Sequence, residues 1–181
     1  MYFPYLRTKQ FELIAIRELC EHVNLENYSP VFEPVKLSST IRTTIRQLIR
    51  VNKNFTVILN PQHGDHIGKE QQIFDFIANE VGDYQNFQYG LIIDQKFVPK
   101  IDYWIEFINS LDVNNGITMI HFGEILKTSI DQLTQNMNVS FNFVYFSKTS
   151  RRYYRNFPEG TCVSLDDYFI SQKKNADYLG L

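Results

Sequence analysis

The sequence has few of the features that would assign it to a specialised class of protein. Its two cysteines, Cys20 and Cys162, lie far apart and outside any metal-binding spacing, which argues against a disulfide framework and a zinc site. No apolar run approaches the ~20 residues that a transmembrane helix needs. The N-terminus lacks the basic region and apolar stretch of a signal peptide. We therefore expect a cytoplasmic protein without a membrane partner.

The sequence also lacks a strong charge bias and the common catalytic motifs. A net charge of −2 gives no whole-chain electrostatic reason to bind nucleic acid or anionic membranes. No G-x-G-x-x-G follows the first expected strand, and no G-x-S-x-G, Walker-type or kinase-type motif occurs. We expect no cofactor, and any function must be read from where polar side chains fall in the fold.

What the sequence does contain is a repeated pair of elements. The run 55–61 is apolar and β-branched and ends at Asn60-Pro61, which is typical of a strand buried on both faces. Similar runs predict seven strands, at 3–7, 31–35, 55–61, 88–93, 117–120, 139–146 and 161–165. Between them, apolar residues at helical spacing predict helices at 9–22, 40–51, 69–81, 98–111 and 123–135.

Strands that alternate with amphipathic helices predict right-handed βαβ units and a parallel sheet in a single α/β domain, residues 1–181. The even spacing favours a TIM-barrel-like (β/α) barrel of about seven parallel strands, and the alternative is an open doubly wound parallel sheet. A closed barrel of eight βα units typically needs ~250 residues, so we expect an incomplete barrel or a chain truncated at its C-terminus.

The C-terminal ends of the strands are where α/β proteins build their sites. Glu33 lies where the apolar run of the second expected strand breaks, and Asp94, His121 and Asp166 follow three others. Carboxylates and imidazoles can transfer protons, so these four are our catalytic candidates. Cations and an amide at the same edge would bind an anionic substrate. These binding candidates are Arg7, Lys9, Lys36 and Asn60.

Three other groups of residues have competing interpretations. His63 and His66, with Asp65 between them, could hold a divalent metal together with Asp94 or His121, but such spacing is common by chance and we expect no metal. Residues 151–155 alternate cations with tyrosines, which fits either single-stranded nucleic acid or a surface loop whose tyrosines pack inward. Arginines at 42, 46 and 50 form a basic stripe that is typical of a solvated helix face.

Three segments carry a resemblance to a known family. Residues 2–12 (Tyr-Phe-Pro-Tyr-Leu-Arg-x-Lys-Gln-Phe-Glu), residues 30–36 (Pro-Val-Phe-Glu-Pro-Val-Lys), and the late pair Asp-Asp-Tyr-Phe (166–169) and Asn-Ala-Asp-Tyr (175–178) are similar to the Beta-protein family of phages, prophages and bacterial mobile elements. The resemblance implies a barrel-like α/β domain of unassigned biochemistry, encoded beside a protein partner. By position it marks Arg7, Lys9, Glu12, Glu33, Lys36, Asp166, Asn175 and Asp177. Members of that family continue well past the Asn-Ala-Asp-Tyr segment, whereas this chain stops four residues after Asp177.

Two functions remain open from the sequence. The first is an enzyme, a hydrolase of a phosphorylated or nucleic-acid substrate, with the polar site described above. The second is a non-catalytic interaction or defence-system partner protein from a phage or mobile element, acting with a neighbouring gene product or as a homo-oligomer.

The missing eighth strand leads to one further expectation. A seven-stranded parallel sheet leaves an edge of unpaired backbone groups. We expect residues 168–181, which include Tyr178, Leu179 and Leu181, or a second copy of the chain, to cover that edge.

Overall fold

Seven parallel strands form one sheet in the computed structural model, which describes residues 2–22, 27–111, 113 and 115–166. The strands follow one another in chain order across the sheet, and each pairs in parallel with the next. They are β1 (Tyr5–Leu6), β2 (Val31–Phe32), β3 (Phe55–Ile58), β4 (Phe87–Ile93), β5 (Ile117–His121), β6 (Val139–Tyr145) and β7 (Cys162–Leu165).

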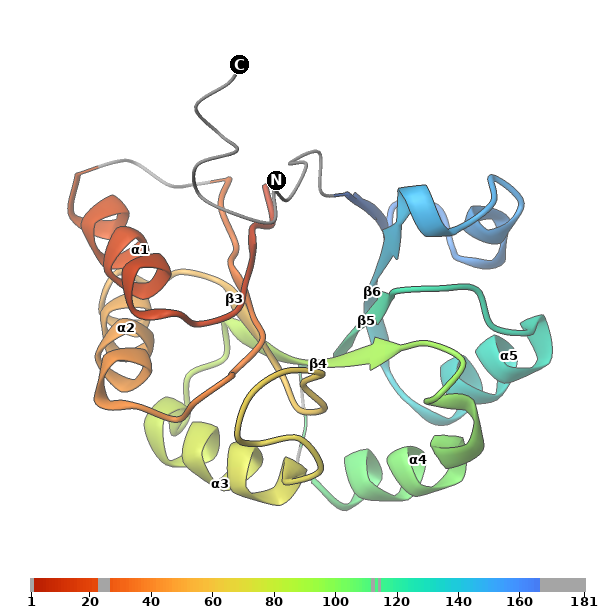
Figure 1. Cartoon of the computed structure of the whole chain (residues 1–181), viewed down its shortest axis with the longest axis horizontal. Coiled ribbons are helices and arrows are strands. Elements are labelled where there is room, and N and C mark those ends of the chain that lie inside the picture. Colours follow the sequence, from red (N-terminus) through yellow and green to blue (C-terminus); the bar gives the residue numbers. More distant parts are fainter. Residues whose placement is uncertain (1, 23–26, 112, 114, 167–181) are drawn as a thin grey trace, which may run out of the picture.

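Five α-helices cover the convex side of this sheet, which curls into an open half-barrel (Figure 1). Because sequential order puts every crossover helix on the same face, the structure confirms the barrel-like arrangement over a doubly wound sheet with helices on both faces. The helices are α1 (Gln10–His22), α2 (Ser39–Arg50), α3 (Glu70–Val81), α4 (Ile101–Ser110) and α5 (Lys127–Asn136), and short 3-10 turns occur at η1 (Val98–Lys100), η2 (Phe146–Lys148) and η3 (Tyr153–Asn156).

The side chains of each strand alternate between two apolar layers. On β4, Tyr89, Leu91 and Ile93 pack outward against the helices, whereas Ile92 packs inward on the concave side. The same alternation places Ile58 of β3 inward. This alternation decides which side chains beyond the end of each strand lie on the inner side of the sheet.

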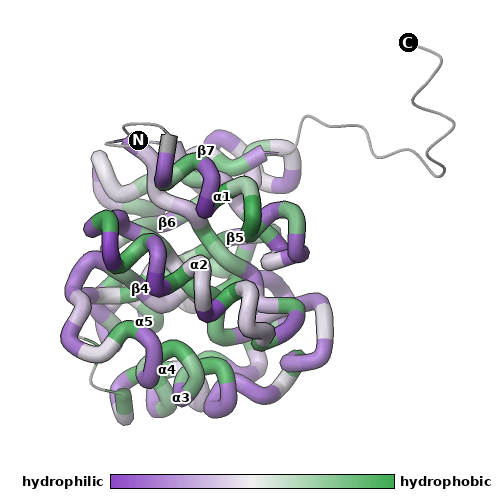
Figure 2. The backbone as a smooth tube through the Cα atoms, turned by 90° about the vertical axis from the view of Figure 1, so that its left-hand side faces the viewer, coloured by the Kyte–Doolittle hydropathy of each residue, from purple (hydrophilic) through white to green (hydrophobic). Residues whose placement is uncertain are grey.

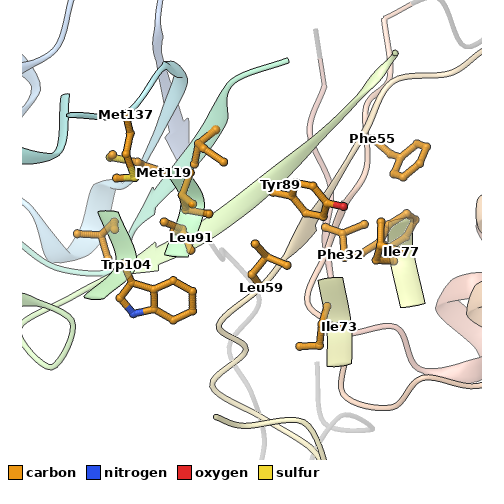
Figure 3. Close-up of a cluster of buried hydrophobic side chains, with 14 of the residues drawn as sticks. Phe32, Phe55, Leu59, Ile73, Ile77, Tyr89, Leu91, Trp104, Met119 and Met137 are labelled. Atoms are coloured by element: carbon orange, nitrogen blue, oxygen red, sulfur yellow. The ribbon is translucent and has the colours of Figure 1, made fainter. Parts of the chain in front are cut away.

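The larger of the two layers lies between the sheet and the helices. Figure 3 shows part of it, where Phe32, Tyr89 and Leu91 from the sheet and Leu59 just after β3 lie near Ile73 and Ile77 of α3 and Trp104 of α4. Figure 2 shows that the hydrophobic residues gather along the strands in the interior and the hydrophilic ones at the outer turns. Among the described helices, none is both long enough and apolar enough to cross a membrane.

The inner layer joins the β1 end of the sheet to the region of β5 and β6 without backbone pairing. Phe3, just before β1, lies with its ring centroid 4.8 Å from that of Phe143 on β6, and Tyr5 lies 5.6 Å from Phe122. Within the described residues β1 pairs only with β2 and β7 only with β6, so no eighth strand closes the barrel. The segment 168–181, which we expected to cover this edge, lies outside the described residues.

Candidate active site

Glu33 lies at the centre of the polar groups at the C-terminal edge of the sheet. It directly follows β2, in phase with the inward-facing Val31, and its side chain is fully buried. One oxygen, Oε1, accepts hydrogen bonds from the backbone N–H groups of Gln62 (2.7 Å) and His63 (3.1 Å). The other, Oε2, accepts one from the hydroxyl of Tyr5 (2.9 Å). These bonds offset the cost of burying a carboxylate.

The imidazole of His63 binds the same carboxylate. Its Nδ1 lies 3.0 Å from Oε1 of Glu33. Because a carboxylate oxygen only accepts, Nδ1 donates this bond, and in the neutral ring Nε2 is left as an acceptor. Nε2 has no hydrogen-bond partner among the residues that the structure describes, and the side chain of His63 is 46 % exposed. This is the arrangement in which an acid orients an imidazole base.

Hydrogen bonds join the loops that carry Glu33 and His63. Thr8 donates its hydroxyl to the carbonyl of Glu33 (3.2 Å) and accepts from the N–H of Val35 (3.1 Å). The carbonyl of Val35 in turn accepts from the N–H of Asp65 (2.9 Å), two residues after His63. The connections after β1, β2 and β3 therefore hold one another around the Glu33 carboxylate.

His63 opens onto a cleft of about 910 Å³ between the β3–α3 and β4–α4 connections. A cleft of this volume is within the range of small-molecule sites. Asn60 and Asp94 also line it, as expected from their places after β3 and β4. The cleft further contains Lys96 and Lys100.

Asn60 and Asp94 are both engaged with the protein itself. The amide of Asn60 donates to the carbonyl of Ile92 (2.8 Å) and accepts from its N–H (2.7 Å). Asp94 Oδ1 accepts from the N–H groups of Lys96 (2.9 Å) and Phe97 (3.0 Å), and its Oδ2 accepts from the side-chain amide of Gln62 (3.0 Å). Gln62 thus links Asp94 to Glu33.

Of the three cations expected to bind substrate, the structure brings one to Glu33. Arg7 Nε lies 3.9 Å from Glu33 Oε2, with half of its side chain exposed. Lys9 immediately precedes α1, and its N–H donates to Glu12 Oε2 (3.1 Å). Lys9 and Lys36 are exposed, and in the described part of the chain neither ammonium group forms an ion pair.

His121 is placed away from this cleft. It ends β5 in phase with the outward-facing Met119, so its ring is buried on the helix side of the sheet. Its Nε2 lies 3.2 Å from Oδ1 of Asn142, and the hydroxyl of Tyr153 lies 3.0 Å from its Nδ1. Burial lowers the pKa of His121 to about 4. A catalytic role for it stays a prediction that this location does not favour.

Asp166 and residues 151–155 lie at the other end of the sheet. Asp166 follows β7 and accepts from the hydroxyl of Ser147 (3.0 Å), which places it outside the cleft. Tyr153 is buried against His121, and Tyr154 donates to the carbonyl of Val144 (3.3 Å). Both tyrosines of this basic stretch therefore pack on the protein, which is the second of the two interpretations given above.

The two histidines of the β3–α3 loop point to different partners. His63 binds Glu33, whereas Nε2 of His66 accepts from the N–H of Leu37 (3.4 Å). Across the described residues no three His, Cys, Asp or Glu side chains come together as a metal site would require.

Comparison with known proteins adds no further constraint. Models of protein families, curated proteins and solved structures were all searched, and none matches this chain. The assignment of a function therefore depends on the geometry of the site alone.

The site contains functional candidates that the sequence reasoning did not single out. The sequence places His63 after the third strand but does not mark it as the base, and it does not indicate Lys96 or Lys100. The alternation of strand side chains indicates part of this, because Glu33 and Asp94 are in phase with inward residues of their strands and His121 is in phase with an outward one. The pairing of His63 with Glu33, 30 residues apart, depends on loop conformation and has no sequence signal.

Proposed function

We propose that the protein is a hydrolase that cleaves a phosphate ester, with His63 as its general base. The observation that carries the proposal is the contact of His63 Nδ1 with the buried Glu33 carboxylate at the mouth of the cleft. The carboxylate fixes the ring orientation and stabilises the imidazolium that forms during proton transfer.

In the proposed reaction, Nε2 of His63 takes a proton from a water molecule while the water oxygen bonds to phosphorus. The bond between phosphorus and the leaving oxygen breaks on the opposite side of the phosphorus, where solvent protonates the leaving oxygen, and the imidazolium returns its proton to solvent. The net change is the addition of water across the ester. Lys96 and Lys100 supply positive charge for the phosphoryl oxygens, and this electrostatic contribution is large in phosphoryl transfer.

The test is a panel of phosphomonoester and phosphodiester substrates with the wild-type protein and His63→Ala. We expect kcat to fall about 10²–10⁴-fold, which is the usual contribution of a general acid–base group. Added imidazole should restore part of the lost activity to His63→Ala, because the freed space next to Glu33 can hold it. His66→Gln changes a histidine of the same loop that does not line the cleft, and it should keep the activity.

Glu33→Gln examines the positioning role of the carboxylate. The variant should fold, since Gln has the same shape, but it should lower kcat and change the pH profile of the reaction because the ring is no longer held by an anion. Full activity of His63→Ala, or no hydrolysis of any substrate in the panel, would overturn the proposal.

A second candidate is a non-catalytic docking protein, and the open edges of the sheet favour it. β1 and β7 each lack a second strand neighbour within the described residues, and unpaired strand edges are sites of strand addition. Sedimentation of the protein alone and with the product of its neighbouring gene tests this candidate. A monomer that binds no such product would exclude it.

A further inference from the structure

The cleft beside His63 has apolar side chains exposed on both of the connections that form it. Ile67, from the β3–α3 loop, is 57 % exposed, and Tyr103, from α4, is 46 % exposed. Large apolar side chains are seldom left exposed in a concave site unless a ligand covers them. The pair suggests a flat apolar group as part of the ligand.

Tyr103 is held in position for such a contact. One face of its ring stacks on Phe107 at 6.0 Å and 16°, and its edge meets Trp104 at 5.4 Å and 75°. The hydroxyl donates to the carboxylate of Glu70, which raises the pKa of Tyr103 to about 12. The hydroxyl of Tyr103 therefore stays protonated near pH 7. Because Phe107, Trp104 and Glu70 already hold the side chain in place, ligand binding costs little side-chain entropy.

The same cleft has positive charge that the protein does not neutralise by contact. The ammonium groups of Lys96 and Lys100 form no ion pair and no hydrogen bond with any described residue. The two carboxylates of the cleft are already used: Asp94 accepts from two backbone N–H groups and from Gln62, and Glu70 accepts from Tyr103. An anion is the complementary ligand for the two lysines.

We propose that this cleft binds a nucleoside monophosphate, with its base between Tyr103 and Ile67 and its phosphate on Lys96 and Lys100. The inference names the ligand of the cleft in which we placed the hydrolase. It rests on the proposed function only where it implies that the bound nucleotide is hydrolysed; binding itself does not depend on that function. A base offers a π-face to Tyr103, and stacking of this kind tolerates any of the bases. The phosphate then lies on the wall that Lys96 and Lys100 form.

Binding can be measured directly because Trp104 is the single tryptophan of the chain and lines the cleft. The probes are adenosine 5′-monophosphate, adenosine, ribose 5-phosphate and inorganic phosphate, titrated against the tryptophan fluorescence of the wild-type protein. We expect a saturable change with adenosine 5′-monophosphate. Each fragment should bind at least about tenfold more weakly, because it keeps only one of the two contacts.

Substitutions assign each half of the ligand. Tyr103→Leu should weaken nucleotide binding about tenfold through loss of stacking, and the Lys96→Ala, Lys100→Ala double variant by at least as much through loss of charge. Lys148→Ala, which removes a lysine that does not line the cleft, should leave the affinity unchanged. Circular dichroism of each variant confirms that it is folded.

The outcomes separate this inference from the proposed function. Nucleotide binding that His63→Ala retains, without hydrolysis by the wild-type protein, supports the inference and overturns the hydrolase. Hydrolysis of a phosphate ester without nucleotide binding overturns the inference and keeps the hydrolase. Equal affinity for ribose 5-phosphate and the nucleotide also overturns the inference, because it removes the role of the base.

Discussion

The Cα atom of Gly64 lies against the backbone of Val35, so closely that a Cβ on Gly64 would collide with the carbonyl oxygen of Val35. Gly64 also has a φ of +92°, which only glycine adopts readily. Its neighbour His63 is therefore fixed beside Glu33 by a backbone contact that no larger residue permits.

Gly64→Ala should push the β3–α3 loop away from Val35 and separate His63 from Glu33. We expect a loss of about 2–3 kcal/mol in the free energy of unfolding, from the positive φ and the collision together, and a fall in any activity that needs His63. Urea unfolding measures the stability. Gly82→Ala is the control, since Gly82 also has a positive φ but has open space where its Cβ would be. It should lose only about 1 kcal/mol, and equal losses would contradict the role of the collision.

Tyr5→Phe should remove one hydrogen bond to the Glu33 carboxylate and leave the packing of the Tyr5 ring unchanged. The Tyr5 hydroxyl donates to the carboxylate at 2.9 Å, and burial together with this carboxylate raises the pKa of Tyr5 strongly. A hydrogen bond to a charged group contributes about 1.5–3 kcal/mol, and one to a neutral group about 0.5–1.5 kcal/mol. Tyr84→Phe removes a bond to the neutral carbonyl of Lys53 (2.8 Å), so it should cost less than Tyr5→Phe in the same unfolding experiment.

The fold could be predicted from the sequence because each of its units has a local signal. All five helices and all seven strands lie where the apolar spacing placed them, to within a few residues. The first two strands are shorter than expected, with only two residues each. Pro4 and Pro30 directly precede them, and proline has no N–H with which to extend a ladder.

The site was less predictable because it depends on which face a residue occupies and on contacts between loops. Glu33 and His121 both follow apolar strands, but the first is in phase with an inward residue and the second with an outward one. The arginine stripe is exposed to solvent, as expected, but Arg42 and Arg46 also each lie 2.7 Å from Glu80 of α3, which the sequence does not indicate. A partner 34 residues away on a different helix cannot be read from helical spacing.

Glu80→Gln should therefore loosen α2 from α3. Its carboxylate side chain is only 6 % exposed and meets both arginines, so losing its charge leaves two guanidinium groups without their partner. We expect a loss of about 1–2 kcal/mol in the free energy of unfolding, and the difference from wild type should shrink in high salt. Asp131→Asn breaks the exposed pair with Lys127 (2.9 Å) and should cost less than about 0.5 kcal/mol. Similar costs for the two variants would show that the Glu80 cluster contributes little.

His121 should make the protein sensitive to mild acid. The pKa of His121 is about 4 in the folded protein and 6.5 ordinarily. As pH falls below 6.5, the imidazole is therefore protonated in the unfolded chain but stays neutral in the folded protein. This difference leaves the free energy of unfolding unaffected above pH 6.5 and lowers it as pH falls toward 4, by about 3 kcal/mol in all. Tyr153 and Asn142 contact the ring but supply no negative charge to oppose this effect.

Urea unfolding between pH 7 and pH 4 measures this dependence. His121→Gln removes the titrating group, and the slope of its unfolding free energy against pH should be shallower than that of the wild type by up to about 1.4 kcal/mol per pH unit. The carboxylates contribute equally to both proteins, so only the difference between the slopes is attributed to His121. Identical slopes would contradict a neutral buried imidazole.

The curl of the sheet should depend on the rings that meet across its concave side. Phe3 lies just before β1, the first strand of the sheet, and Phe143 lies on β6, next to the last strand, so their contact at 4.8 Å spans the opening where backbone pairing would close a barrel. Phe3→Ala should lower the free energy of unfolding by about 2 kcal/mol, since it removes a partly buried ring and an aromatic pair. Phe11→Ala removes a ring that is 81 % exposed on α1 and should change the stability by less than about 0.5 kcal/mol. If the two variants unfold at the same urea concentration, the rings do not hold the ends of the sheet together. The curl then depends on the helices that cover its convex side.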